Sequence, residues 1–235
     1  MNVYSEQREE YQRYRLNNLN DTEKSELIKK MLLFNQLIKL LVKWKKEKNH
    51  QTEQEVLKDL SFVPVIKCLY IVCLLSVREE RDKSLFDIFD FEAFPKGGVN
   101  KDCYYFIDQL PNYTIRENNG VEELTFRDSS NLQYKDLFSY IEALEKRLGI
   151  NIKQDKKEAI IKEYDTYYQM LEDAVNDLKK ASNFPGFRER ERLIELTHMK
   201  IWKDAFYQQD SHTMDTKNKK DILDEAMFLR WNIAA

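Results

Sequence analysis

Apolar side chains recur at helical spacing along most of this chain, and the clearest run follows Asn20. The apolar positions of this run are Leu27, Met31, Phe34, Ile38, Leu41 and Trp44. Steps of three and four residues place such positions on one face of a helix. Asn20 and Glu23 have the spacing of a capping box, in which each residue satisfies a backbone amide of the other. The pattern predicts a long amphipathic helix from Asn20, while residues 1–20 form either a short amphipathic helix or a frayed arm.

A second helix start lies at Thr52, where Glu55 occupies the reciprocal position of a capping box. The helix that begins there meets Pro64, which suits the first turn of a helix and disrupts a helix interior. The apolar stretch 65–77 follows Pro64 directly. We therefore expect two helices, separated near Pro64.

The second half of the chain shows four more helical patterns. Ser129 or Ser130 suits the N-cap of the first, and Gly149 suits the left-handed residue that ends it. Polar segments or a Pro-Gly pair separate the others. The expected helices run from Ser129 or Ser130 to 148, and over about 155–181, 188–207 and 216–231.

Two glycine-containing segments indicate turns. Asn119-Gly120 stands between YTIR at 113–116 and VEELTF at 121–126, and both turn residues tolerate positive φ. This segment predicts a β-hairpin near 113–126. Gly97 and Gly98 follow Pro95 closely and predict a tight turn.

Composition supports the helical interpretation. The 235 residues include only 5 glycines and 4 prolines, which disfavours folds built from many turns, such as sandwiches, barrels and propellers. We expect a mainly α fold: a compact multi-helix domain with one small β-hairpin. In this interpretation residues 1–58 form an N-terminal helical extension, 59–210 the helical core, and 211–235 a C-terminal helix packed on the core.

Charge and cysteine usage limit the environment of the chain. A net charge of −3 and a pI near 5.8 give no global attraction to nucleic acid or anionic lipid. The longest apolar run, 68–75, is far shorter than the roughly 20 residues of a membrane span. Cys68, Cys73 and Cys103 cannot all pair, and the N-terminus lacks the apolar region of a secretory signal. We expect a cytoplasmic protein without a membrane partner.

Metal, cofactor and nucleophile chemistry find little support. His50, His198 and His212 are scattered, and the sequence has no cysteine pair with ligand spacing, no phosphate-binding loop and no dinucleotide fingerprint. We expect no metal and no cofactor. Cys68 and Cys73 lie in the most apolar stretch, where a reactive thiolate is disfavoured.

One pair of residues resembles a catalytic motif. Arg192 and His198 have the spacing of the arginine and histidine in HEPN-class ribonucleases. Six residues along a helix leave two side chains about 120° apart, so a shared site needs a helix start or a partner subunit. A polar-face arginine and a half-buried histidine explain the pair more simply, and the ribonuclease remains an alternative.

A basic segment indicates a second alternative. Lysines at 39, 43, 45, 46 and 48 surround Trp44. Such a helix binds nucleic acid, a membrane surface or an acidic partner in some proteins, and in others its lysines only complement the helix dipole. The dipole interpretation is the simpler one, and a nucleic-acid-binding regulator is the alternative.

Three separated segments carry a combined motif: IKCLY at 66–70, LFD at 85–87 with FEAFPKGGV at 91–99, and LTH at 196–198 with a later tryptophan and alanine. In order and spacing they resemble the Panacea domain, the SocA-like antitoxin family of bacterial and phage toxin–antitoxin systems. Phe94, Lys96 and Gly98 depart from the usual tryptophan, aromatic residue and proline of that family. The motif residues are Lys67, Tyr70, Phe91, Glu92, Phe94, Gly97, Gly98, Thr197, His198 and Trp202.

The resemblance implies an antitoxin that binds a cognate toxin protein directly and neutralises it without catalysis. A SocA-like variant acts as an adaptor that delivers its toxin to a protease complex. Nucleic acid is not an expected partner. The resemblance also assigns His198 to a packed helical signature, so we expect Thr197, His198 and Trp202 to be buried, with Thr197 or His198 hydrogen-bonded toward the turn at 91–98.

Two surfaces compete for the toxin contact: the Gly97-Gly98 turn with neighbouring Lys67, Tyr70 and Glu92, and the apolar faces of the helix after Asn20. The helix is the better candidate, because it lies outside the matched motifs. It carries Leu32, Leu33, Leu37 and Leu40 in addition to its main stripe. This is more apolar surface than one packed stripe requires, so the helix is either enclosed within the fold or offered to a partner. We therefore expect the toxin-binding residues to be Leu27, Met31, Phe34, Ile38, Leu41 and Trp44.

Overall fold

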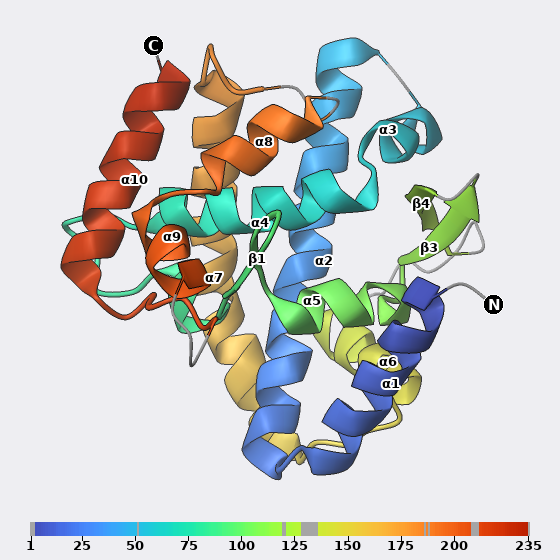
Figure 1. Cartoon of the computed structure of the whole chain (residues 1–235). Helices are drawn as coiled ribbons and strands as arrows, with labels where there is room; N and C mark the ends of the chain where they lie inside the picture. Colours follow the sequence, from blue (N-terminus) through green and yellow to red (C-terminus); the bar gives the residue numbers. More distant parts are fainter. Residues whose placement is uncertain are drawn as a thin grey trace.

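The computed structural model describes residues 3–50, 52–118, 121–127, 136–185, 187, 189–207 and 212–234. Over these residues the chain is a compact, mainly α-helical domain with small antiparallel strand pairs (Figure 1), which confirms the predicted fold class. The α-helices are α1 (Val3–Asn18), α2 (Asp21–Asn49), α3 (Glu53–Asp59), α4 (Phe62–Ser76), α5 (Lys101–Phe106), α6 (Leu137–Leu148), α7 (Gln154–Lys180), α8 (Arg190–Leu196), α9 (Lys200–Tyr207) and α10 (Lys219–Ala234). Two 3-10 helices are η1 (Leu85–Asp87) and η2 (Ile107–Gln109).

Helix α4 is apolar on every side and is enclosed by other elements. All its residues except Val63 are buried, and α2, α7, α8 and α10 pack around it, with α4 crossing α2 and α7 in Figure 1. Arg230 of α10 donates to the carbonyl oxygens of Leu75 and Val77 at 2.9 and 2.7 Å, and so satisfies acceptors at the end of α4. Among the described helices, none is long and apolar enough to cross a membrane.

Helix α2 lies inside the same hydrophobic core. The residues of its main stripe are at most 8% exposed, and the leucines on its other faces are buried as well. Helices α3, α5, α6 and α7 pack against α2, so the several apolar faces each meet another part of the chain. The apolar surface that exceeds one stripe is therefore core surface.

One sequence-based expectation is corrected by this packing. The residues expected to bind a toxin do not form an accessible face, because helices of the same chain cover them: Leu27, Met31, Phe34, Ile38, Leu41 and Trp44. The buried apolar side chains of α2 belong to one cluster that continues through α4, α7 and α10. Burial by a partner and burial by the chain's own helices require the same residue types, so the sequence pattern did not distinguish them.

The predicted starts of α2, α3 and α4 are confirmed. Asn20 and Glu23 form the capping box of α2, with the Asn20 amide donating to the Glu23 carboxylate at 2.9 Å. Thr52 and Glu55 form the capping box of α3. Pro64 lies in the first turn of α4, where its missing amide hydrogen leaves no helical bond unmade.

Other helix ends differ in part. Residues 3–18 form a helix and not a frayed arm. Gly149 ends α6 with a φ of 65°, as predicted. The N-cap of α6 is Asp136, whose side chain accepts from the Ser139 amide at 2.8 Å, and Ser129 and Ser130 lie outside the described residues.

The described part of the chain contains two strand pairs, one more than expected. Strands β3 (Tyr113–Asn118) and β4 (Val121–Phe126) form the predicted hairpin; its turn, Asn119-Gly120, lies outside the described residues. Strands β1 (Glu92–Phe94) and β2 (Gly97–Val99) form a second pair, in which Phe94 is opposite Gly97. The predicted tight turn is therefore present: it consists of Pro95 and Lys96, and the two glycines follow it in β2.

The prediction of a single helix over 188–207 is wrong, because the helix is interrupted between α8 and α9. The amide and the hydroxyl of Thr197 both donate to the Ile194 carbonyl, at 2.9 and 2.8 Å. Both hydrogen bonds go to the residue three positions earlier, whereas an α-helix would bond the Thr197 amide to the residue four positions earlier. Helix α8 therefore ends in a tight turn at Thr197. Helix α10 likewise begins at Lys219, later than the expected 216.

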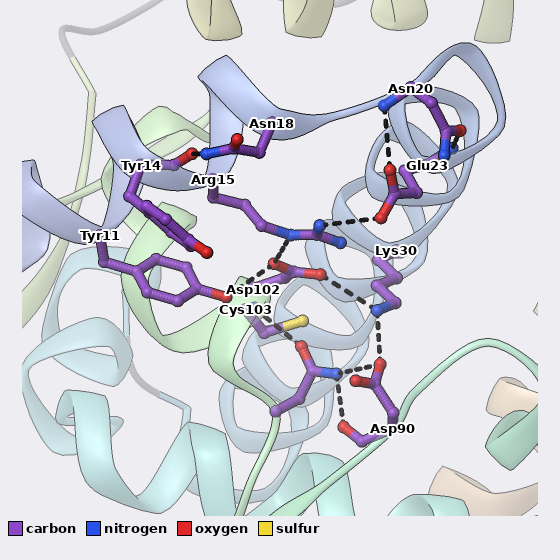
Figure 2. A network of polar contacts seen from close by, with 11 residues as sticks. Tyr11, Tyr14, Arg15, Asn18, Asn20, Glu23, Lys30, Asp90, Asp102 and Cys103 are labelled. Atoms are coloured by element: carbon purple, nitrogen blue, oxygen red, sulfur yellow. Dashed lines mark hydrogen bonds and ion pairs between the residues drawn. The ribbon is translucent and has the colours of Figure 1, made fainter.

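A polar network joins α1 and α2 to α5 (Figure 2). The buried Asp102 carboxylate accepts from Tyr11, Arg15 and Lys30 at 3.1, 3.4 and 3.0 Å. Lys30 also pairs with Asp90, which precedes β1. Burial opposes the charge of Lys30, but Asp102 and Asp90 outweigh this effect and raise the lysine pKa. The network therefore holds the first two helices to the segment that leads into the β1–β2 hairpin.

The position of α2 in the core leads to a stability prediction. Phe34 is fully buried, so Phe34→Ala is expected to lower the free energy of unfolding by about 3–5 kcal/mol through lost burial and a cavity. Tyr14→Ala is the matched control, because Tyr14 is 69% exposed and its loss is expected to change stability by about 0.5 kcal/mol or less. Urea denaturation followed by circular dichroism measures both. Equal, small effects would contradict the central placement of α2.

Candidate functional site

The three motif segments, far apart in sequence, meet around the β1–β2 hairpin. Helix α4 contributes Lys67 and Tyr70. The hairpin and the residue before it contribute Phe91, Glu92, Phe94 and the two glycines, and the α8–α9 connection and α9 contribute Thr197, His198 and Trp202. Lys67 Nζ donates to the carbonyl of Gly98 at 3.4 Å, and Trp202 Nε1 donates to the carbonyl of Phe94 at 2.9 Å. These contacts join α4, the hairpin and α9 into one packed unit.

Gly97 is the point of closest approach in this unit. Its φ is +97°, and a Cβ atom built on it would lie 2.0 Å from Thr197 Oγ1 and 3.1 Å from Lys67 Nζ. Both the backbone conformation and the lack of space require glycine. The position therefore lets the α8–α9 connection and α4 touch the hairpin backbone.

Gly98 fits against an aromatic group. A Cβ at Gly98 would lie 3.1 Å from Met214 Sδ and 3.3 Å from Tyr70 Cδ2. The Tyr70 ring meets Phe91 edge-on, with centroids 5.0 Å apart, and its hydroxyl donates to Glu225 of α10 at 3.3 Å. Burial, together with Glu225, raises the pKa of Tyr70. Tyr70 is thus a structural hydrogen-bond donor.

The late motif packs partly as expected. Thr197 and Trp202 are buried, but His198 is half-buried and stacks on Trp202 with ring centroids 3.9 Å apart. The hydrogen bond to the turn segment comes from Trp202, so the expectation that Thr197 or His198 makes it is wrong. The reason is that the Thr197 hydroxyl donates within its own turn, to Ile194.

His198 keeps one unused polar atom. Its Nε2 is buried and has no hydrogen-bond partner among the described residues. Burial, followed by repulsion from Lys67 and Lys203, lowers the pKa of His198. The neutral imidazole is therefore favoured near neutral pH.

A segment that the sequence analysis did not connect to the site completes it. The Ala93 amide donates to the His212 carbonyl at 2.7 Å, and the Met214 amide donates to the Phe91 carbonyl at 2.9 Å. Glu92 pairs with Lys101 at 2.7 Å. Backbone pairing of this kind depends on no side-chain motif, so residues 212–214 gave no sequence signal.

Lys67 is the unusual residue of the site. It is 2% exposed, and its one hydrogen bond in the described residues goes to a backbone carbonyl. Buried lysines normally pair with a carboxylate. Burial, with Arg190 and Lys96 adding repulsion, lowers the pKa of Lys67 to about 7.

Lys67 lines a pocket of about 510 Å³. Lys96 and Arg190 are exposed residues of the same pocket, and among the described residues no acidic side chain lines it. Its walls are largely apolar or aromatic, and they include Phe62, Ile66, Phe94, Val99, Tyr104 and Tyr105. The pocket combines three cationic side chains with a surface suited to an apolar group.

The ribonuclease-like pair lies in a different groove, of about 540 Å³. Arg192 and His198 both line it, but Arg192 is exposed and pairs with Glu189 at 3.7 Å, while His198 stacks on Trp202. No hydrogen bond joins Arg192 to His198 in the described part of the chain. The groove brings the two residues to one surface without linking them.

The basic segment of α2 is largely engaged by its own fold. Lys45 Nζ lies 4.7 Å from the centroid of the Phe187 ring, and Lys39 Nζ lies 5.7 Å from that of Tyr140. Lys46 pairs with Glu53 at 3.4 Å. These contacts favour the interpretation that the lysines belong to the surface packing of α2.

Helix α10 carries exposed apolar side chains that the sequence analysis did not single out. Phe228 and Trp231 are 57% and 68% exposed, and Met227 lies beside them. We call these three residues the α10 patch. The sequence did not show that these side chains are exposed. Helix α10 has apolar residues on more than one side, and the buried helix α4 has the same pattern.

Metal and thiol chemistry find no assembled site in the described residues. No group of three or more His, Cys, Asp or Glu side chains there is placed to hold a metal ion. Cys68, Cys73 and Cys103 are buried, and burial raises the pKa of each thiol. The thiols are therefore inert packing groups.

Comparisons of the chain with family models, with curated proteins and with solved structures give no match. The resemblance to the Panacea domain therefore rests on the motif residues themselves. Their convergence around one hairpin is the structural observation that bears on it.

The close approach at Gly97 gives a prediction. Gly97→Ala is expected to lower the free energy of unfolding by more than about 2 kcal/mol, because the new methyl group overlaps Thr197 and the φ is left-handed. Thermal or urea denaturation measures the loss. Adding Thr197→Ala is expected to recover part of it by removing Oγ1, and the double-mutant cycle gives the coupling energy.

Gly149→Ala is the matched control for backbone strain alone. Gly149 has a φ of 65°, and a Cβ there would meet no atom within 4 Å. Its substitution is expected to cost about 1–2 kcal/mol, the strain of a left-handed residue. Equal losses at the two glycines would show that Thr197 does not press on Gly97.

The buried Lys67 gives a pH prediction. Its pKa of about 7 in the fold lies below the ordinary value of 10.5, so the unfolded chain binds more protons between these values. The stability contribution of Lys67 is therefore lowest below about pH 7 and rises with pH, by at most about 1.4 kcal/mol per pH unit. The gain in stability between about pH 6 and pH 9 is expected to be smaller in Lys67→Met than in the parent protein.

Urea denaturation of both proteins across this pH range measures the difference. Lys96→Gln serves as the control, because Lys96 is exposed and its substitution removes a charge without removing the buried ammonium. Parallel pH curves for the parent and Lys67→Met would show that Lys67 keeps an ordinary pKa.

Proposed function

We propose that this chain is an antitoxin that neutralises a cognate toxin by binding it directly in the cytoplasm, without catalysis. The observation that carries the proposal is the packing of the three Panacea-like segments around the β1–β2 hairpin. Lys67 and Thr197 both lie against Gly97 although the three residues are far apart in sequence. A shared motif whose members meet in space is what a common domain requires.

The physical character of the described residues suits a binding module. Two polar residues of the motif are engaged in structural contacts: Tyr70 with Glu225 and Thr197 with Ile194. A rigid helical scaffold that presents exposed aromatic side chains binds a partner at low entropic cost. In the adaptor variant of the proposal, the bound toxin is delivered to a protease.

The contact surface must lie outside the buried stripe of α2. The α10 patch offers exposed apolar side chains, and the pocket at Lys67 offers cationic groups beside an apolar wall. Both are accessible in the free chain. The proposal therefore moves the expected partner contact from α2 to these surfaces.

The test uses the product of the reading frame adjacent to the gene for this chain. Co-expression is expected to restore growth of cells that produce that product, and the two proteins are expected to co-purify as a stable complex. Size-exclusion chromatography with light scattering measures the complex. Growth arrest that persists, together with the absence of a complex, would contradict the proposal.

A ribonuclease is the second candidate, favoured by the presence of Arg192 and His198 in one groove. Purified full-length chain is incubated with total RNA beside His198→Ala and Arg192→Gln. Under the antitoxin proposal, the preparations leave RNA intact. RNA cleavage that is lost in both variants while their melting temperatures stay unchanged would establish the ribonuclease and overturn the antitoxin proposal.

A further inference from the structure

The pocket at Lys67 holds positive charge that no described residue balances. Lys67 is buried, and Lys96 and Arg190 are the other cationic lining residues. Neither Lys96 nor Arg190 forms an ion pair with a described residue, and no carboxylate lines the pocket. Unpaired buried charge is costly, and it is retained where a ligand supplies the missing counter-charge.

The Lys67 ammonium has donors to spare. An ammonium group carries three donors, and in the described residues one of them is used by the Gly98 carbonyl at 3.4 Å. Two donors remain, which match the two oxygens of one carboxylate. Glycine at position 97 leaves the space next to Lys67 Nζ open, because a Cβ atom there would lie 3.1 Å from Nζ.

We propose that the Lys67 pocket receives a carboxylate side chain of the partner protein, with a neighbouring apolar residue of that partner against the aromatic wall. The inference rests on the proposed function, because it names the chemistry by which the partner is recognised. Lys67 binds the carboxylate at depth, and Lys96 and Arg190 attract the acidic segment at the rim. The pocket volume of about 510 Å³ is sufficient for two side chains.

A carboxylate fits the pocket better than a phosphate group. A phosphate brings up to two negative charges and three acceptor oxygens, which need several converging donors when buried. The buried part of this pocket offers one ammonium and otherwise mostly apolar side chains such as Ile66, Val99 and Phe62. A singly charged group with two oxygens leaves no buried acceptor unsatisfied.

Binding of the carboxylate is coupled to the protonation of Lys67. The charged groups near Lys67 are Lys96 of the β1–β2 turn, Arg190 of α8 and His198 of the α8–α9 connection, and all of them oppose its charge when they are cationic. A bound carboxylate favours the ammonium form, so complex formation takes up a proton above pH 7. Affinity is therefore expected to fall as pH rises from about 7 to 9, by up to about tenfold per unit.

The experiment measures the affinity of the full chain for the adjacent gene product by calorimetry at about pH 6.5 and pH 8.5. Lys67→Met is expected to weaken binding at least about tenfold at the lower pH and to remove most of the pH dependence. The double variant Lys96→Gln with Arg190→Gln alters exposed residues only and is expected to weaken binding about three- to tenfold. It keeps the proposal testable if Lys67→Met does not fold.

Two matched controls accompany these variants. Lys43→Gln with Lys46→Gln removes two exposed cations of α2, away from the pocket, and is expected to change affinity less than about twofold. Phe228→Ser with Trp231→Ser alters the α10 patch. Loss of binding in the α10 variant, with retained affinity in both pocket variants, would overturn the inference and leave the antitoxin proposal standing.

A direct probe separates this inference from the proposed function. Acetate and inorganic phosphate are titrated into the full chain labelled with ¹³C at lysine Cε, and the Lys67 resonance is followed. Acetate is expected to raise the Lys67 pKa, and Lys67→Met identifies the signal. A Lys67 resonance that responds to neither anion, or to phosphate alone, would overturn the carboxylate assignment, whereas failure of the parent chain to bind the adjacent gene product would overturn the proposed function.

Discussion

The enclosure of α4 is the constraint on which the rest of this fold depends. A helix with apolar side chains on every face has no side to present to water, so it needs covering elements all round. Helices α2, α7, α8 and α10 supply that cover, together with strand β2 and the 3-10 helix η1. Because these elements come from both ends of the described chain, the enclosure of one helix brings together segments that are far apart in sequence.

Lys67 is the one charged residue within this enclosed helix. An ammonium there is tolerated because the Gly98 carbonyl accepts one hydrogen bond and because a pocket opens beside it. The same β1–β2 hairpin that provides this carbonyl also receives Thr197 at Gly97. Lys67 and Thr197 therefore both contact strand β2, at Gly98 and at Gly97.

Local chemistry made part of this structure predictable. The capping box at Asn20, the left-handed Gly149 and the β3–β4 hairpin each depend on residues a few positions apart, so the sequence contains the whole signal. The break after α8 depends on Thr197, which turns back on its own helix beside a glycine 100 positions earlier in the chain. The covering of α2 likewise depends on which helices fold over it. The motif residues of the site were found in the sequence, but Arg190 and residues 212–214 were not, because tertiary packing alone brings them there.

The hydrogen bonds from Arg230 to the end of α4 have a consequence for synthesis of the protein on the ribosome. Leu75 and Val77 leave the exit tunnel long before Arg230 is translated. Until then, their carbonyl groups lack the hydrogen bonds from Arg230, and α10 does not yet cover the apolar flank of α4. At about 5–20 residues per second, the interval between these positions lasts roughly 8–30 s. During that time the flank of α4 that α10 covers in the folded chain stays exposed. Transiently exposed hydrophobic surface of this kind makes a folding intermediate prone to aggregation, and the packing of α10 removes it.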